Sequence, residues 1–475
     1  MERTLRPTAL AFLALVLAAA TDALVRGAGW GINAGILAFA VAAPCLWIGR
    51  SSPLRLTKSG KWLGGFAILF AALFSLRDSD SLKVGNGFAI ALCLGAMILP
   101  VTDQALRESN VYRLLVEPFL RLLRLPLQAG ELAVESQKET QVSPTVHRRS
   151  RAVIRGLLLA LPLILVFGGL FASADAVFRA KIADLFDVNL DGEALIAHVA
   201  TLAVSLTLIA GLLHRLFLRK EPSVPPVIRE AKPRGMGIIE IGIVLGSLNF
   251  LFGAFLAVQF RYLFVARDVV KATHGLSFAE YARGGFFELV CVAALALTVL
   301  LGADALLKRE NARDQFNFQW LGRALVVMVF CVVGSALLRM KLYTDVFGLT
   351  ELRVYSSVFM VWLSLAFAWL LATTLNGQSQ RFVFGSFLAG LLVIFGTNLL
   401  NPDALMVRTN LAKPQADFSY LETLSDDAVL AIQDMKESVP PNHRAESERL
   451  IEKEKASLAT GDWRELNLSR LSLLR

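Results

Sequence analysis

Long apolar blocks, separated by shorter polar segments, dominate the hydrophobic pattern of this chain. Most blocks run for roughly 18–25 residues, the length that a helix needs to cross the ~30 Å hydrocarbon core of a bilayer. The pattern predicts an all-α fold, a polytopic transmembrane helix bundle of about eleven spans. Because one block is short and only a tight glycine-rich turn separates the first two, ten or twelve spans are the alternatives. The predicted spans are 8–25, 31–49, 62–76, 84–102, 153–173, 194–217, 236–260, 285–306, 321–338, 354–375 and 383–400.

Composition agrees with a membrane protein. Of the 475 residues, 55% are hydrophobic and 18% are charged, and the mean hydropathy is +0.57. A soluble domain averages about 45–50% apolar residues even when glycine is counted. The first block, from Thr8 to Val25, is longer than the apolar region of a usual secretory signal peptide, so we interpret it as a retained helix.

Basic residues favour alternate loops. The formal net charge is +9. The loops 50–61, 103–152, 219–234 and 308–313 together hold twenty Lys and Arg, whereas the alternate loops hold nine. By the positive-inside rule the four more basic loops are cytoplasmic, which predicts a cytoplasmic N-terminus. After eleven crossings the tail that begins at Asn401 would be extracytoplasmic. Orientation of helices explains the positive charge, so we expect no nucleic-acid partner.

The predicted topology divides the chain into four parts. Residues 1–102 hold the N-terminal spans, 103–152 form a basic cytoplasmic loop, 153–400 hold the C-terminal span core, and 401–475 form a soluble helical tail. Apolar residues interspersed with arginines over 111–124 predict an interfacial amphipathic helix, or a helix packed under the bundle.

Two further features complete this division. The polar stretch 128–150 is expected to be mobile. In the tail, Pro440-Pro441 separates two helical stretches.

Familiar catalytic motifs are missing from the sequence. It has no GxxxxGK[ST] phosphate loop, HExxH, GxSxG or CxxC pair, and its five histidines have no ligand-like spacing. The four cysteines all lie in apolar blocks, where they are typical of packing residues. We therefore expect no cofactor and no metal site, and an enzyme with a familiar active site is disfavoured.

Polar residues at membrane depth are functional candidates because they are costly to bury there. In the predicted topology many gather toward the extracytoplasmic side, where a carboxylate needs a cation, water or a proton. We expect Arg283, Arg339 and Arg353 to be the partners of Glu288 and Asp22. The candidate polar cluster comprises Asp22, Tyr281, Arg283, Glu288, Arg339, Tyr343, Asp345 and Arg353.

Glycines allow two local interpretations. The pair Gly284-Gly285 could form part of a re-entrant or gating element, or belong to an ordinary loop before a helix with Glu288 in a structural ion pair. The series Gly27, Gly31 and Gly35, and the GxxxG at 242–246, are typical of close helix packing.

Three stretches together resemble a known group of proteins. They are 278–290; 338–343 with 347–353; and a tail pattern of Asn401-Pro402-Asp403, Asn410, Asp417, Tyr420-Leu421, 424–428 and 463–470. The sequence resembles bacterial polytopic membrane proteins of the domains of unknown function 4153 and 4173, over roughly residues 150–475. The resemblance implies location in the bacterial cytoplasmic (inner) membrane and a helical architecture. It implies no activity, because the group has none established.

Three functions stay open on the sequence. The first is a non-enzymatic sensing or scaffolding component of the bacterial cell envelope, with the lipid bilayer as partner and the tail as a candidate site for a protein partner. The second is a transporter or channel-like protein with an outer-side polar cavity, which the apolar middle turns of most spans disfavour. The third is a membrane enzyme acting on lipid-linked or envelope substrates, with Glu288 or Asp22 as acid or base.

Overall fold

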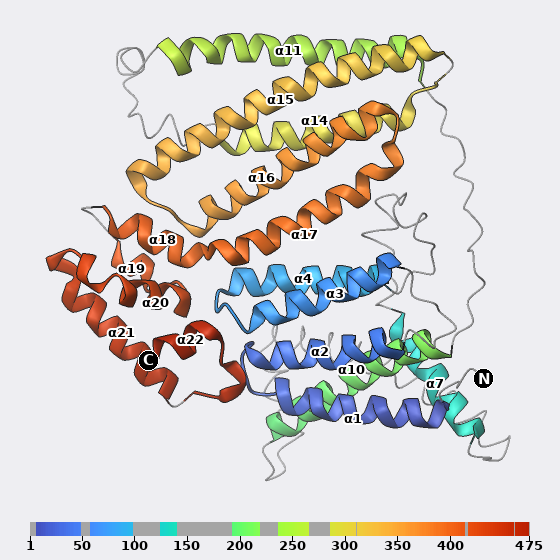
Figure 1. Cartoon of the computed structure of the whole chain (residues 1–475), viewed down its shortest axis with the longest axis vertical. Coiled ribbons are helices and arrows are strands. Elements are labelled where there is room, and N and C mark those ends of the chain that lie inside the picture. The colour runs from blue at the N-terminus through green and yellow to red at the C-terminus, as the bar shows by residue number, and fades with distance from the viewer. Residues whose placement is uncertain are drawn as a thin grey trace, which may run out of the picture. The chain divides into compact units, whose positions relative to one another are not determined.

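The computed structural model describes residues 6–48, 58–97, 124–139, 192–218, 236–265, 286–309, 311–413, 417–459 and 461–474 (Figure 1). Within these ranges every named element is a helix, and the one β-type pairing is an isolated bridge between Met236 and Leu307. The predicted all-α class is therefore confirmed.

The helices of the described residues follow the predicted spans. Ten of the eleven predicted spans coincide with a helix, and the eleventh, 153–173, lies outside the described residues. Seven described helices are long and apolar enough to cross a bilayer, namely α1, α10, α11, α14, α15, α16 and α17. The ten helices are α1 (Pro7–Val25), α2 (Ile32–Ile48), α3 (Lys58–Phe74), α4 (Asp80–Met97), α10 (Gly192–Phe217), α11 (Ile238–Val265), α14 (Phe286–Leu306), α15 (Ala312–Phe347), α16 (Glu351–Ala372) and α17 (Phe382–Leu400).

Helix α15 is much longer than the predicted span 321–338. It runs for 36 residues, about 54 Å at 1.5 Å per residue, which exceeds the ~30 Å hydrocarbon core. Hydropathy detects only the apolar middle, whereas the helix continues into polar turns at both ends. It stops at Gly348, which has a φ of 79°. Glycine adopts this φ without strain because it has no Cβ.

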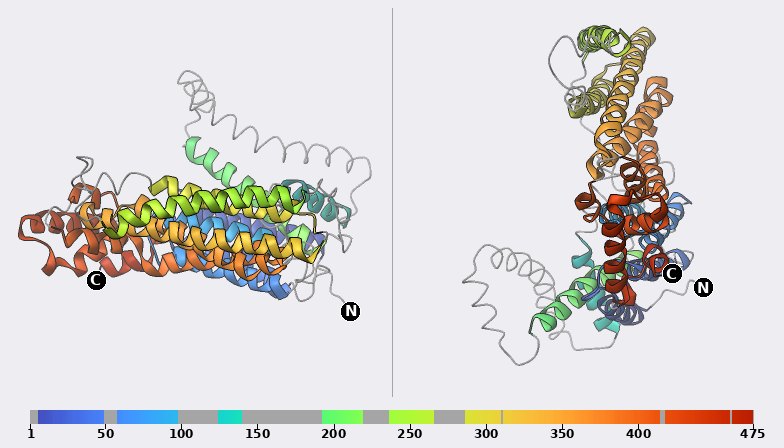
Figure 2. Two further views of the ribbon diagram at one scale, coloured as in Figure 1. Left: turned by 90° about the horizontal axis from the view of Figure 1, so that it is seen from above. Right: turned by 90° about the vertical axis from the view of Figure 1, so that its left-hand side faces the viewer.

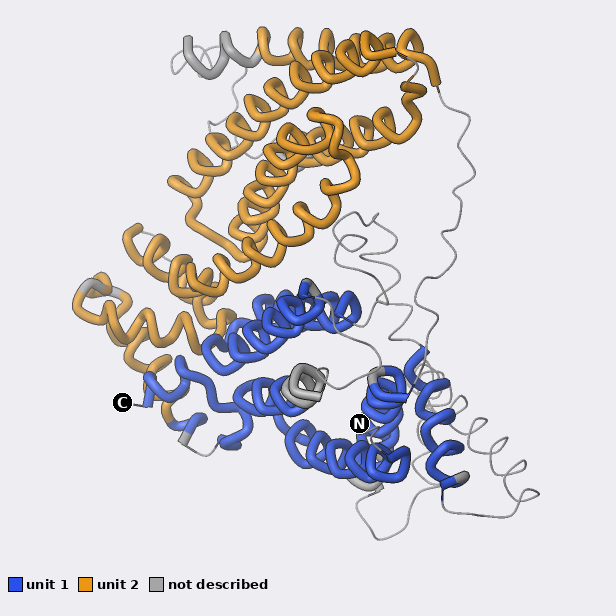
Figure 3. The backbone as a smooth tube through the Cα atoms, turned by 45° about the vertical axis from the view of Figure 1, so that its right-hand side comes forward, with its two compact units in different colours: residues 1–103, 111–223, 456–475 blue, residues 104–110, 224–455 orange. Residues whose placement is uncertain are grey.

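The chain forms two compact units (Figure 3). Unit 1 comprises residues 1–103, 111–223 and 456–475, and unit 2 comprises 104–110 and 224–455. The last twenty residues thus belong with the N-terminal helices, whereas the earlier part of the tail belongs with α11 to α17. The predicted four-part division follows expected membrane topology and stays a prediction.

Unit 1 contains α1–α4, α10 and a helix that the sequence did not predict. Residues 128–139, expected to be mobile, lie in α7 (Leu125–Glu139), which packs against α10 and α1. Leu125, Ala129 and Leu132 of α7 are buried, so a short apolar stripe fixes a segment that is polar on average. A Cβ on Gly211 of α10 would lie 2.0 Å from the Leu125 carbonyl oxygen, so this glycine permits the contact. The interfacial helix expected over 111–124 lies outside the described residues.

Unit 2 contains α11 and α14–α17, which run lengthwise beside one another (Figure 2), and the first tail helices. Its core includes Phe318, Val329, Met360 and Phe367, all buried on facing helices. The start of α11 is tied to the end of α14, because Met236 N–H donates to Leu306 (2.7 Å) and Lys308 N–H to Met236 (3.0 Å). The tail helices are α18 (Pro402–Leu411), α19 (Phe418–Leu421), α20 (Asp426–Asp434) and α21 (Arg444–Ala459).

The glycine predictions have mixed outcomes. Gly35 of α2 does approach α3, since its Cβ would lie 2.8 Å from the Ser75 hydroxyl. A Cβ on Gly242 or Gly246 would have no described atom within 4 Å, so the expected close contact through this GxxxG is wrong among the described residues. Gly31 approaches the tail rather than a second helix.

Candidate functional site

The predicted polar cluster is described only in part. Tyr281 and Arg283 lie outside the described residues, and of Glu288 only the backbone, at the start of α14, is described. Asp22 belongs to unit 1, whereas Arg339, Tyr343, Asp345 and Arg353 belong to unit 2. The cluster as a whole stays a prediction, and its described members are taken unit by unit.

Asp22 has partners other than those expected. Its side chain is 6% exposed, and its Oδ2 lies 2.6 Å from Nδ1 of His198 on α10. Its Oδ1 lies 3.8 Å from Nε of Arg26, one helical turn further along the chain. The expected pairing with Arg283, Arg339 or Arg353 stays a prediction, because Arg283 lies outside the described residues and the other two belong to unit 2. The described partners come from the near neighbour at i+4 and from the packing of α10 on α1, and only the first could be found from sequence spacing.

Tyr343 and Arg353 do come together in unit 2. The guanidinium carbon of Arg353 lies 4.3 Å from the centroid of the Tyr343 ring, a cation–π distance. Arg353 also donates to the carbonyl oxygens of Phe347 (3.3 Å) and Gly348 (2.5 Å). These bonds satisfy carbonyls at the end of α15 that have no helical partner. Asp345 is exposed and Arg339 is half-buried on α15.

Asn410 of α18 holds the turn between α15 and α16. Its Oδ1 accepts from Leu349 N–H (2.7 Å), and its Nδ2 donates to Leu349 C=O (2.8 Å). The amide therefore pairs with the turn as a neighbouring strand would. A Cβ on Gly348 would lie 2.4 Å from Asn410 Oδ1, so this glycine is needed for the approach as well as for its positive φ.

Two further tail residues contact the same turn. The hydroxyl oxygen of Tyr420 accepts from Glu351 N–H at 2.8 Å, which satisfies a donor at the first turn of α16. Lys413 Nζ donates to the carbonyl oxygen of Thr344 in the last turn of α15. Asp417 caps α19 by accepting from Tyr420 N–H at 3.2 Å, which fixes the helix that carries the tyrosine.

A buried carboxyl group in the first turn of α18, that of Asp403, binds Ser425 at the start of α20. Asp403 is 1% exposed, and its Oδ2 accepts from the Ser425 hydroxyl and, at 3.4 Å, from Ser425 N–H. Its Oδ1 is buried without a hydrogen-bond partner among the described residues. Burial, with the nearby carboxylates of Asp427 and Glu351, raises the pKa of Asp403 to about 6. The preceding Asn401, at φ 53°, accepts from Ala404 N–H (3.2 Å) and starts α18.

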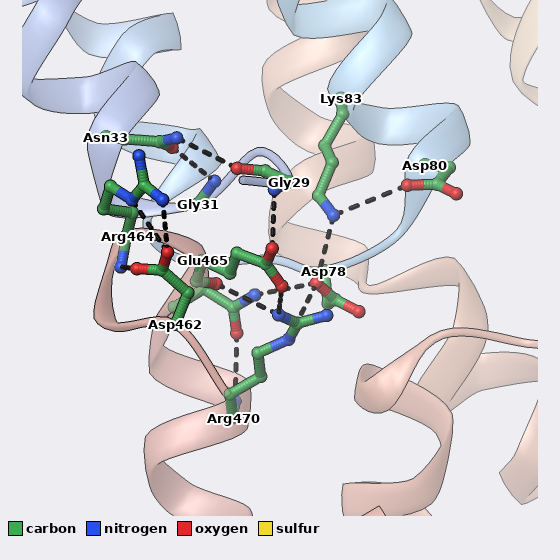
Figure 4. Close-up of polar contacts among 11 residues, drawn as sticks. Gly29, Gly31, Asn33, Asp78, Asp80, Lys83, Asp462, Arg464, Glu465 and Arg470 are labelled. Carbon is green, nitrogen blue, oxygen red and sulfur yellow. Dashed lines mark hydrogen bonds and ion pairs between the residues drawn. The ribbon is translucent and has the colours of Figure 1, made fainter. Parts of the chain in front are cut away.

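In unit 1 the end of the tail docks on the turn between α1 and α2 (Figure 4). Glu465 Oε1 accepts from Gly29 N–H at 2.6 Å, and Ile32 N–H donates to the Leu466 carbonyl at 2.8 Å. A Cβ on Gly31 would lie 2.3 Å from the Glu465 carbonyl oxygen, so Gly31 lets the two backbones meet. Asn33, fully buried, shapes the turn by accepting from Gly31 N–H (2.8 Å).

The same segment docks on the turn between α3 and α4. Asp78 Oδ1 accepts from Asn467 (2.9 Å) and lies 3.3 Å from Arg470 Nε and 3.0 Å from Lys83 Nζ. Leu468 N–H donates to the Ser75 carbonyl at 2.8 Å. One carboxylate from the turn thus binds two tail residues and one helix residue, and Figure 4 shows it between Lys83 and Arg470.

Arg464 binds the end of α1. Its Nη1 donates to the carbonyl oxygens of Ala23 (2.8 Å) and Arg26 (2.9 Å), which lack helical partners. Asp462 orients the guanidinium by accepting a 2.8 Å hydrogen bond from Arg464 Nε. The hydrogen bonds that Asp462 accepts from the side chain and backbone of Arg464 lower the pKa of Asp462. The contact is charge-assisted and directional, which suits a helix C-terminus.

Sequence reasoning found one half of each docking contact. The tail residues of the resemblance, within 401–428 and 463–470, were expected on the same side of the membrane as the polar cluster, but their docking on helix turns was not predicted. The other half carries no motif: Asp78 lies in the turn between α3 and α4, and Asn33 and Lys83 lie in the first turns of α2 and α4. Another buried polar contact was also missed: His214 of α10 is 3% exposed and lies 3.6 Å from Glu131 and 3.5 Å from Glu135 of α7.

No group of three or more His, Cys, Asp or Glu side chains within the described ranges is arranged to hold a metal ion. The hydrogen bonds and ion pairs of the tail form two docking contacts, and these are the candidate site: tail on the α15–α16 turn in unit 2, and tail on the α1–α2 and α3–α4 turns in unit 1.

Comparison with protein families decides the relationship. The profile of the family described as domain of unknown function (DUF4153) matches residues 64–435. The chain belongs to DUF4153. The match confirms the resemblance found in the sequence, and it includes Gly348, Asn401, Asp403, Asn410 and Tyr420 of the unit 2 docking contact. Residues 463–470 of the unit 1 contact lie beyond it. Comparison with curated proteins and with solved structures gives no match.

Proposed function

We propose that this DUF4153 protein is a multi-pass protein of the bacterial cytoplasmic membrane that acts as a non-enzymatic scaffold or sensor. Its N-terminus is cytoplasmic and its tail extracytoplasmic. One observation carries the proposal: Asn410, Tyr420, Glu465 and Asn467, from the tail pattern, all bind helix turns within the chain. The polar groups of the tail serve to hold it against the helix ends.

Three turns support the proposed topology. The tail contacts the turns after α1 and α3 in unit 1, and the turn after α15 in unit 2. All three turns follow odd-numbered spans counted in the proposed order, and all three are predicted to be extracytoplasmic. A tail bound to them would lie on their side of the membrane.

The tail also joins the two units through the chain itself. Residues up to Lys455 belong to unit 2 and residues from Ala456 onward to unit 1, so the chain passes from one to the other within α21. Any ligand or force that releases one docking contact acts on a segment continuous with the other. This connection supports a sensing or scaffolding role.

Three hydroxyl groups inside the spans bond within their own helix, which weighs against a role for them in a transport pathway. Ser364 donates to Met360 C=O (2.8 Å) and Thr397 to Val393 C=O (2.8 Å), each one turn back in its own helix. Thr298 bonds to Ala294 in the same way at 3.0 Å. Hydroxyls satisfied within their own helix need no partner in a pore. Asn249 of α11 differs, because it also donates across to the Leu321 carbonyl of α15 at 3.1 Å.

The enzyme alternative is supported by the 2.6 Å pair of Asp22 and His198, the shortest carboxylate–imidazole contact among the described residues. A carboxylate that orients an imidazole is a component of general-base sites. Replacement of His198 by Gln tests it: loss of function at normal abundance would favour the enzyme over the scaffold.

Complementation of a deletion strain tests the scaffold. Asn410→Ala and Asn467→Ala, which each remove one docking contact, should reduce rescue of the deletion phenotype while the protein stays in the membrane. Ser364→Ala and Thr397→Val serve as matched controls inside the spans and should rescue fully. Full rescue by the docking variants would overturn the proposal, and failure of the span variants alone would favour transport.

A further inference from the structure

The end of the tail exposes apolar side chains that the rest of the tail does not. Between Pro402 and Asp462 the structure describes no exposed large apolar side chain. The last residues contain four, Trp463, Leu468, Leu471 and Leu474, which are between 43% and 58% exposed. The exposed apolar side chains of the tail are therefore confined to its last residues. Such a concentration on an otherwise polar surface indicates a binding face.

Helical spacing puts these leucines on one face. In α22 (Leu468–Leu473) and its C-cap, Leu468, Leu471 and Leu474 recur at intervals of three. The opposite side is already occupied, because Ser469 and Leu473 are 2% and 0% exposed. The inner side docks on the helices of unit 1, so the outer leucines are free to contact something else.

The bonds of this segment locate it at the end of an apolar helix. Leu468 N–H donates to Ser75 C=O, and the Ser469 hydroxyl donates to Leu76 C=O at 3.3 Å, just after α3. The turns it binds expose apolar side chains of their own: Trp30 is 47% and Leu76 is 38% exposed. The outer leucines of α22 and these exposed side chains of the turns thus belong to segments joined by hydrogen bonds at the ends of α1 and α3.

We propose that α22 and Trp463 lie in the membrane interface, with their outer apolar face against the lipids of the leaflet on the tail's side. This inference rests on the proposed function in requiring that α1 and α3 cross the bilayer. Tryptophan is enriched at the boundary between headgroups and acyl chains, and a short helix with an apolar outer face suits the same depth. Arg464 and Arg470 already bind partners within unit 1, so apolar contact is the main attraction between this segment and the lipids.

Spin-label accessibility in reconstituted full-length protein tests the inference. In a background without the four native cysteines, labels at Leu471→Cys and Leu474→Cys are compared in vesicles of phosphatidylcholine and phosphatidylglycerol. Glu452→Cys, exposed on α21, is the aqueous control, and Ile243→Cys, exposed on α11, is the lipid control. We expect the ratio of oxygen to nickel-chelate accessibility at 471 and 474 to exceed that at 452 at least several-fold.

Other outcomes have distinct meanings. Equal ratios at 471, 474 and 452 would overturn the interfacial location. A label at 471 shielded from both reagents, or broadened by a second label, would show a protein occupant or a second copy and would also overturn it. A water-like ratio at 243 would instead contradict the membrane crossing on which the proposed function depends. Leu468→Ser with Leu474→Ser, which alters only exposed side chains, should shift the label at 471 toward the aqueous value.

Discussion

Two single residues, Gly348 and Asn410, explain how the tail holds the turn between α15 and α16. Gly348 combines a positive φ with an Asn410 side chain that leaves no room for a Cβ. Asn410 in turn satisfies both polar groups of Leu349. Gly348 has no side chain that could indicate a role from the sequence. Its role follows from its backbone conformation and from its contact with Asn410, which comes much later in the chain.

Gly348→Ala is expected to destabilise unit 2. Gly348 has φ 79° and ψ 176°, a conformation essentially restricted to glycine, so alanine there costs about 1–3 kcal/mol. The clash with Asn410 would add to this cost by breaking its hydrogen bonds. Gly242→Ala is the matched control, because its added Cβ meets no described atom and alanine favours a helix. Thermal unfolding in detergent should show a lower Tm for the first variant only; equal Tm values would contradict the docking role of this turn.

Asp403 should make the stability of unit 2 depend on pH. Its pKa is raised from 3.8 to about 6 in the fold, so the folded state holds the proton more tightly than the unfolded state. Stability should therefore be greatest below about pH 4 and fall as pH rises through 6, by roughly 3 kcal/mol in all. Asp403→Asn should remove this loss, whereas Asp434→Asn, at an exposed position of α20, should retain it. Unfolding followed between pH 4 and 8 measures the difference, and parallel profiles for the two variants would refute the assignment.

At the scale of elements, hydropathy predicts the apolar helices that are long enough to cross a bilayer, and little else. It identified ten described helices because each needs an apolar stretch of sufficient length. It missed α7, whose four buried apolar residues are too few to raise the average, and the polar ends of α15. The docking of the tail also escaped prediction, because Asp78 and Asn33 act through turns whose contacts are hundreds of residues away.

The unit 1 docking contact should behave as a coupled pair. Asp78→Ala leaves Lys83 and Arg470 without their shared carboxylate, and Asn467→Ala removes one donor to it. We expect the double variant to lose less stability than the sum of the single losses, with a coupling of about 1 kcal/mol. Unfolding of the four proteins of this cycle in detergent gives the coupling. Strict additivity would mean that the 2.9 Å contact between Asn467 and Asp78 contributes nothing.

At the scale of the whole molecule, the proposed topology depends on the parity of the crossings. Loop charge predicts a cytoplasmic N-terminus, and an odd number of spans before Asn401 then puts the tail on the other side. The described helices support this count only indirectly, since 153–173 lies outside them. The tail binds the turns after α1, α3 and α15, so the proposed topology requires all these turns to share its side of the membrane.

A reporter enzyme that is active only outside the cytoplasm tests the whole arrangement. Fused after Arg475 it should be active, and fused after Arg309, in the loop between α14 and α15, it should be inactive. The second fusion is the matched control, because that loop is basic and is predicted to be cytoplasmic. Activity at Arg309 with inactivity at Arg475 would invert the orientation and keep the docking. Activity at both positions would require an even number of crossings between them, which contradicts single crossings by each of α15, α16 and α17 and would overturn the proposed topology.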